Sequence, residues 1–234
     1  MGVTIEILAP TFLKQLLGIF FFSVFYLTSQ HSQAQTRDYP WAFGIGWNTV
    51  DFYPNGEGEY PLSWDPRPFS EELFSEFFNS TDHYNSSLHS IRFSFGRYLF
   101  SNISFEVSVA YNQISEYGDM EVDDLDYLAF DGSLNYSFRN LIQPRGDGWA
   151  DPFIGIGGGY TYVEEERTRD LLGTGNIDGT VGFGVWVTNR ISLIYKVTFK
   201  YISYEHELKD FTDSHFQHFI GMKYVFSNQR AGCY

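Results

Sequence analysis

Most of the chain after Tyr39-Pro40 alternates between large apolar side chains and small or polar ones. In residues 103–115, for example, the apolar residues Phe105, Val107 and Val109 are each separated by a small or polar residue. A period of two over about ten residues is typical of a β-strand with one apolar face. The pattern predicts eight strands, at residues 41–52, 88–99, 103–115, 126–138, 152–163, 177–187, 191–204 and 216–226.

The residues on the second face of these strands indicate which way the strands are turned. That face is mainly Gly, Ala, Ser and Asn, with a few charges. A soluble barrel with its apolar face inward would place long Lys, Glu and Gln side chains there, whereas a narrow membrane-barrel lumen requires small ones. Lipid-facing girdles of Tyr and Trp also account for an aromatic content of 20%. We therefore expect an all-β fold, an eight-stranded antiparallel up-and-down transmembrane β-barrel, with a soluble barrel as the alternative.

The connections between the strands support the same fold. Two of them, residues 100–102 and 188–190, are short, and most of the others are long, which is the outer-membrane pattern of short inner turns and long outer loops. Residues 139–151 are an exception, because this connection is long for the inner side. The net charge is −14, and its excess lies in the long loops. A chain this acidic is a poor nucleic-acid binder, so we expect no nucleic-acid partner.

The first 34 residues are typical of an export signal. Lys14 precedes an apolar run at residues 16–27, and Ser32-Gln33-Ala34 fits a cleavage site. The run is shorter than the roughly 20 residues of a membrane-spanning helix. The expected domains are a signal peptide at residues 1–34 and an outer-membrane barrel at residues 35–234, the alternative for the first segment being a buried N-terminal helix. The single cysteine, Cys233, excludes an internal disulfide framework, and its own role stays open.

The opening strand resembles a known family. Gly44-Ile45-Gly46-Trp47-Asn48-Thr49-Val50-Asp51-Phe52-Tyr53-Pro54 is similar to the start of OmpA-type eight-stranded outer-membrane barrels of the porin-like group. Residues 152–160 resemble a mid-barrel strand of the same proteins, and the resemblance covers residues 40–226. It implies that Tyr224 and Phe226, in the last strand, form the signal that the barrel-assembly machinery reads. Many such proteins continue into a peptidoglycan-binding domain that this sequence lacks, so we carry over no expectation of cell-wall tethering.

Seven charged residues fall on the small-residue face and are expected inside the barrel. Buried charges must be paired or solvated. They would form either a static plug of salt bridges or a narrow gated path for small ions, and the second resembles the ion-pair gate of the family. The residues are Arg92, Glu106, Asp131, Asp178, Lys196, Lys200 and Lys223.

The first long loop contains a predicted short helix. Ser70 is a suitable N-cap, with acidic residues in the first turn, and an apolar stripe follows at Leu73, Phe74, Phe77 and Phe78. The stripe would pack on the barrel rim, close over its mouth or dock a partner.

The other polar groups do not predict a cofactor, a metal site or a catalytic site. The acidic loops lack the glycine and closing glutamate of a calcium loop, so we expect a solvated rim bridged by divalent ions to lipopolysaccharide. His89 and His218, with Ser87 and Ser214 nearby in sequence, raise the alternative of a rim-acting enzyme that modifies lipid A. A nucleophile needs a base and an orienting group, and no acidic residue is in register, so we expect no enzyme.

Together these features predict an outer-membrane protein with a structural or adhesive role and at most a narrow gated pore. Its expected partners are outer-membrane lipid, lipopolysaccharide and the barrel-assembly machinery. The main alternative is a barrel subunit of a larger envelope complex for secretion, motility or uptake, in which apolar loop residues dock another protein.

Overall fold

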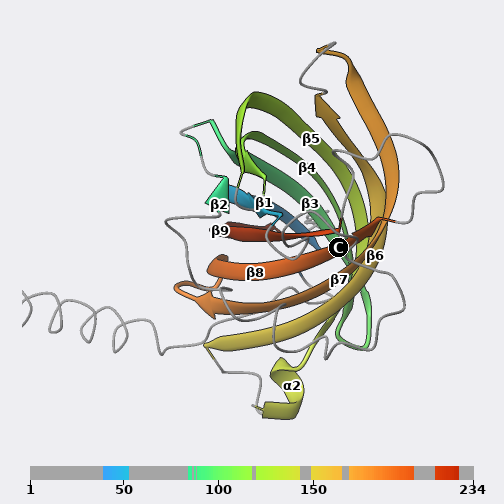
Figure 1. The fold of residues 1–234 in the computed structure, drawn as a ribbon. Coiled ribbons are helices and arrows are strands. Elements are labelled where there is room, and N and C mark those ends of the chain that lie inside the picture. The colour runs from blue at the N-terminus through green and yellow to red at the C-terminus, as the bar shows by residue number, and fades with distance from the viewer. Residues whose placement is uncertain are drawn as a thin grey trace, which may run out of the picture.

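Residues 39–52, 84–85, 87, 89–117, 120–142, 149–164, 169–202 and 214–226 are described in the computed structural model (Figure 1). The predicted signal peptide, the predicted loop helix with Leu73, Phe74, Phe77 and Phe78, and Cys233 lie outside these residues. In the described part, no helix is both long and apolar enough to cross a membrane.

Eight long antiparallel strands close into a barrel. In chain order they are β1 (Trp41–Asp51), β3 (Ile91–Phe100), β4 (Ile103–Tyr117), β5 (Met120–Ser137), β6 (Ala150–Glu164), β7 (Leu171–Trp186), β8 (Ile191–Ile202) and β9 (His215–Phe226). Each pairs with the next, and β9 pairs with β1 along the whole of β1, from Trp41↔Phe226 to Asp51↔Phe216. A two-residue strand, β2 (Tyr84–Asn85), pairs with the end of β1. The predicted all-β, eight-stranded up-and-down barrel is confirmed.

The alternation of side chains follows the predicted faces. On the outer surface, Ile156 is 72% exposed and Val181 is 65% exposed, whereas Lys200 in the lumen is fully buried. The side chains that alternate along β8 are exposed and buried in turn, as its burial pattern shows. An apolar outer wall of this kind is stable only when acyl chains or another apolar phase cover it.

Two hairpins are longer than the sequence pattern predicted. β5 begins at Met120 rather than at residue 126, and β7 begins at Leu171 rather than at residue 177. Acidic residues and glycines have low strand propensity, which hides the ends of these strands in the sequence. The partner strand overrides this preference, because Leu125 pairs with Ile114 and Leu171 pairs with Glu164.

The two ends of the barrel differ in their connections. The β3–β4 turn is made by Ser101 and Asn102, both with positive φ (44° and 69°), a conformation that asparagine tolerates better than most residues. The longer β5–β6 connection contains a one-turn helix, α2 (Arg139–Ile142), at the same end (Figure 1). We refer to this as the short-turn end, and to the opposite end as the loop end.

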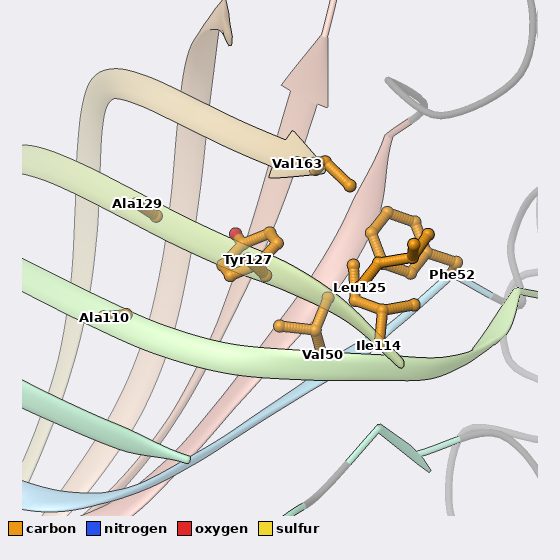
Figure 2. Packing of buried hydrophobic residues seen from close by; sticks show 8 residues of the cluster. All are labelled: Val50, Phe52, Ala110, Ile114, Leu125, Tyr127, Ala129 and Val163. Carbon is orange, nitrogen blue, oxygen red and sulfur yellow. The ribbon is translucent and has the colours of Figure 1, made fainter. Parts of the chain in front are cut away.

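Large apolar side chains occupy both ends of the lumen, which the sequence pattern did not predict. The cluster nearer the loop end, named here the upper apolar cluster, is shown in Figure 2 and consists of Val50, Phe52, Ala110, Ile114, Leu125, Tyr127, Ala129 and Val163. The lower apolar cluster consists of Ala42, Trp186 and Val225. The charged residues lie on the strands between these two clusters.

Candidate functional site: the barrel lumen

The predicted interior charges are inside the barrel. Four of them lie close together, namely Arg92, Asp131, Asp178 and Lys200. Asp131 of β5 accepts a hydrogen bond from the Lys200 Nζ at 2.5 Å, and its second oxygen lies 4.0 Å from the Arg92 guanidinium. All three side chains are nearly excluded from solvent, with 0–4% of each exposed. Buried charges are stable in such a place only when they are paired, so each of these groups depends on the others.

We refer to Arg92, Asp131, Asp178 and Lys200 together as the charge layer. Uncharged polar side chains form hydrogen bonds with it. The guanidinium of Arg92 donates to Gln217 Oε1 at 2.7 Å and to Ser108 Oγ at 2.8 Å. The Asn176 amide donates to Asp178 at 2.5 Å and to Asp131 at 3.5 Å. The layer therefore joins six strands (β3, β4, β5, β7, β8 and β9) by contacts across the lumen.

A second ion pair lies nearer the short-turn end. Lys196 of β8 donates to the Glu106 carboxylate of β4, across the lumen. The ring of Phe219 lies between the two layers, with the Lys196 Nζ 5.3 Å and the Arg92 guanidinium 6.0 Å from its centroid. Cations placed over an aromatic face in this way are stabilised by the ring quadrupole.

The seventh predicted charge, Lys223, is placed differently. Its Nζ lies 5.4 Å from the centroid of the Trp186 ring, and the guanidinium of Arg139 lies 5.8 Å from the same centroid. The structure therefore brings six of the seven predicted charges into two paired layers and leaves Lys223 with a cation–π contact. Arg139 and Asp151 join this end of the lumen although the sequence analysis assigned both to a connection.

Asp151 was detectable in principle, because it shares the parity of the small-residue positions in β6. Its carboxylate accepts hydrogen bonds from the hydroxyl of Ser137 and, at 3.4 Å, from the indole N–H of Trp186. Arg139 gave no such signal, because it belongs to α2 and reaches the lumen only through the bend of the chain after β5.

A cavity of about 190 Å³ lies in the lumen beside these groups. Its charged lining is Arg139, Lys196, Lys223, Glu106 and Asp151, and its neutral polar lining includes Asn102, Asn135 and Asn140. Asn140 is exposed, and Asn102 belongs to the β3–β4 turn, so this part of the cavity wall lies at the short-turn end of the barrel.

The upper apolar cluster lies in the lumen toward the loop end. Phe52, Tyr127 and His215 meet there: the ring of His215 lies 4.7 Å from that of Phe52, and the Tyr127 hydroxyl is 2.9 Å from His215 Nε2. The sequence analysis missed this cluster. Val50, Phe52, Ile114 and Val163 all have the inward parity of their strands, so extending the alternation to the strand ends would have found them.

At the loop end of the barrel, Arg169 contacts two neighbouring hairpins. Arg169, at φ 59°, contacts Asp123 at 3.9 Å and Glu164 at 3.5 Å, and donates to the carbonyl of Asp124 at 3.0 Å. It thereby ties the β4–β5 hairpin to the β6–β7 hairpin, at partly exposed positions where an ion pair contributes little stability by itself. In the described residues, no group of three or more His, Cys, Asp or Glu could hold a metal ion.

Of the histidines and serines of the enzyme alternative, Ser87 and His89 are in contact, because the His89 backbone N–H donates to the Ser87 hydroxyl at 3.2 Å. His218 is buried on the outer side of β9, where its Nδ1 is 3.0 Å from the Tyr195 hydroxyl and its ring is 4.7 Å from the ring of Tyr84. Ser87 bonds locally with Ser90, and His89 is exposed. The Ser214 hydroxyl accepts from the backbone of Ile202 at 3.3 Å.

Comparison with known proteins places the fold. No family model matches the sequence, and no curated protein matches it. OprG from Pseudomonas aeruginosa superposes with a TM-score of 0.50 at 13% identity, over 86% of this chain and 99% of that chain. The chain has the fold of the eight-stranded outer-membrane β-barrels.

Two further solved structures are similar at a lower score. Neisserial surface protein A has a TM-score of 0.47 at 12% identity, over 80% of this chain and 96% of its own. AlkL, determined in lipid bilayers, has a TM-score of 0.48 at 15% identity, over 86% of this chain and 96% of its own.

Proposed function

We propose that this chain is an outer-membrane protein with a structural or adhesive role, whose lumen offers at most a narrow, gated path for small ions. The observation that carries the proposal is the filling of the lumen. The upper apolar cluster, the Arg92–Asp131–Lys200 layer and the Lys196–Glu106 pair lie in series along the barrel. An ion would have to pass all three, and desolvation in an apolar constriction is costly.

The rim supports the adhesive part of the proposal. The hairpins β4–β5 and β6–β7 are the longest in the barrel, and Arg169 joins them. Asp123, Asp124 and Asp170 are exposed beside it, so this surface is acidic and held by backbone pairing. A preformed surface of this kind loses little conformational entropy when it binds a partner.

Planar-bilayer conductance tests the lumen. We expect the wild-type protein to show at most brief, small openings. Tyr127→Ala opens only the apolar cluster, Arg92→Ala only the charge layer and Lys196→Ala only the Lys196–Glu106 pair. Each change alone should therefore alter conductance little, and the triple variant should raise it. A large steady conductance of the wild-type protein would overturn the proposed closed lumen. If Arg92→Ala alone raises the conductance, the charge layer is the gate.

Replacing residues 115–124 by a two-residue Asn-Gly turn tests the adhesive role. This change shortens the β4–β5 hairpin and keeps the barrel register, because the turn then joins Ile114 to Leu125, which already pair. We expect cells that display the shortened protein to lose attachment to epithelial monolayers and abiotic surfaces relative to cells that display the wild type. Equal attachment, at equal surface levels measured by antibody, would remove the adhesive role and leave the structural one.

Two assays address the alternatives. Native pull-down in mild detergent would recover a stoichiometric envelope protein if the chain is a subunit of a larger complex, and we expect the barrel alone.

We also infer a non-enzymatic role, supported by the Tyr195–His218 contact that occupies one ring nitrogen of the buried histidine. Mass spectrometry of lipid A from strains with and without the protein should give identical acylation patterns, and a changed pattern would contradict this.

A further inference from the structure

The cavity at the short-turn end has more positive than negative groups on its wall. Three cations line it, Arg139, Lys196 and Lys223, against two carboxylates. Lys196 already takes Glu106, and Asp151 already accepts from Ser137 and Trp186. Among the described residues, Lys223 forms no salt bridge, and its Nζ lies 5.4 Å from the centroid of the uncharged Trp186 ring.

We propose that this cavity binds a small oxyanion, a carboxylate or a phosphate, between Lys223 and Arg139. Both cations face the one Trp186 ring and both line the cavity, so they converge on the same space from β9 and from α2. A half-buried ammonium without a carboxylate partner is stabilised by any anion that reaches it. Hydrogen bonds from a cation to an oxyanion are the strong, charge-assisted kind.

The surrounding wall suits an oxyanion as well. Lys223 pairs across the sheet with Gly44 and Ser192, whose small side chains leave its ammonium room to move toward a ligand. The side-chain amides of Asn102, Asn135 and Asn140 also line the cavity. Asn135 donates to Ser133 and Asn140 donates to Asn102, but an amide nitrogen carries two N–H groups, so each can donate a second hydrogen bond to a ligand oxygen.

Size and access limit the ligand. The 190 Å³ of space is enough for several waters, at about 10–15 Å³ each, and therefore for a phosphate or a short carboxylic acid with some water. The Lys196–Glu106 pair and Phe219 close the inner side of the cavity. A solute therefore enters and leaves at the short-turn end, which faces the periplasm in outer-membrane barrels.

The test is a titration of the refolded barrel in lipid nanodiscs, followed by backbone amide NMR at constant ionic strength. Inorganic phosphate and acetate are titrated separately. We expect saturable shifts at Gly44, Gly96 and Ser192, next to the cavity, with the tighter of the two anions identifying the ligand class. Shifts that do not saturate, or that appear only on the outer surface, would overturn the proposal.

Variants separate binding from general charge effects. Lys223→Met and Arg139→Gln, on two different elements, should each weaken binding by about tenfold or more, and Lys223→Arg should retain it. Arg97→Gln is the matched control, because Arg97 is exposed and its guanidinium lies over Trp41 at 4.9 Å, on the outer face. Unchanged affinity in both lumen variants would mean that Lys223 is merely solvated, and would refute the site. Each variant is first checked for the heat-modifiable mobility of a folded barrel.

Discussion

At the scale of single residues, Asp131 is the residue on which the lumen most depends. Both Lys200 and Arg92 approach its carboxylate, at 2.5 and 4.0 Å. Removal of its charge leaves the buried cations Lys200 and Arg92 with less negative charge beside them. Removal of an exposed acid leaves no buried cation without its counter-charge. The pair Asp131 and Asp123 therefore offers a direct comparison.

We expect Asp131→Asn to lower the free energy of unfolding by about 3–5 kcal/mol, the usual cost of leaving a buried charge without its partner. Asp123 is 78% exposed and lies 3.9 Å from Arg169, so Asp123→Asn should cost less than about 1 kcal/mol. Urea unfolding in lipid vesicles, followed by tryptophan fluorescence, measures both. Equal losses would mean that the charge layer does not brace the barrel.

At the scale of the elements, the close approach of β5 and β6 depends on glycines. A Cβ atom at Gly159 would lie 2.1 Å from the backbone oxygen of Phe130 and 2.9 Å from the Asp131 Cα. Gly159 pairs directly with Asp131, so the same position sets where the key carboxylate stands. Gly179, on the outer face of β7, has no atom within 4 Å of such a Cβ.

Gly159→Ala should therefore destabilise the barrel by about 1–3 kcal/mol through overpacking against backbone that cannot move aside. Gly179→Ala should change the free energy of unfolding by about 0.5 kcal/mol or less, because the new methyl group projects from the outer face and has no protein atom within 4 Å. Refolding into vesicles, scored by heat-modifiable electrophoretic mobility, compares the two. If Gly179→Ala is the more damaging, the orientation of the strands is wrong.

At the scale of the whole molecule, the apolar outer wall decides where the protein can reside. Ile156 lies in the middle of β6 and is 72% exposed, whereas Leu99 lies near the end of β3 and is 42% exposed. If acyl chains cover this wall, the cost of a charge should depend on its depth in the bilayer.

Ile156→Lys should cost about 2–4 kcal/mol in vesicle-folded protein, and Leu99→Lys about 0–1 kcal/mol. Folding titrations in urea with bilayer vesicles give both values. Equal, small costs, together with recovery of the protein from periplasmic fluid without detergent, would contradict a membrane location.

Much of this molecule could be predicted from residue order alone. The period of two determined the strands, and the contrast between aromatic and small residues determined which face is outside, because a narrow lumen cannot hold large side chains on every strand. Parity put seven charges on the small-residue face, and in the structure five of them are buried and two, Glu106 and Lys223, are partly buried. The strand ends could not be predicted in this way, because the acidic and glycine-rich stretches that continue β5 and β7 become strands only when a partner strand pairs with them.

What the tertiary structure decided is which inward residues meet. Strand parity puts Asp131, Arg92 and Lys200 on one face, but they come from β5, β3 and β8, and only barrel closure and register bring them together. The same holds for Phe52 and His215, and for Arg139 and Lys223 around Trp186. Alternation is a local property that each strand carries by itself. Pairing across a lumen depends on the shear of the closed sheet, which no single segment of the sequence encodes.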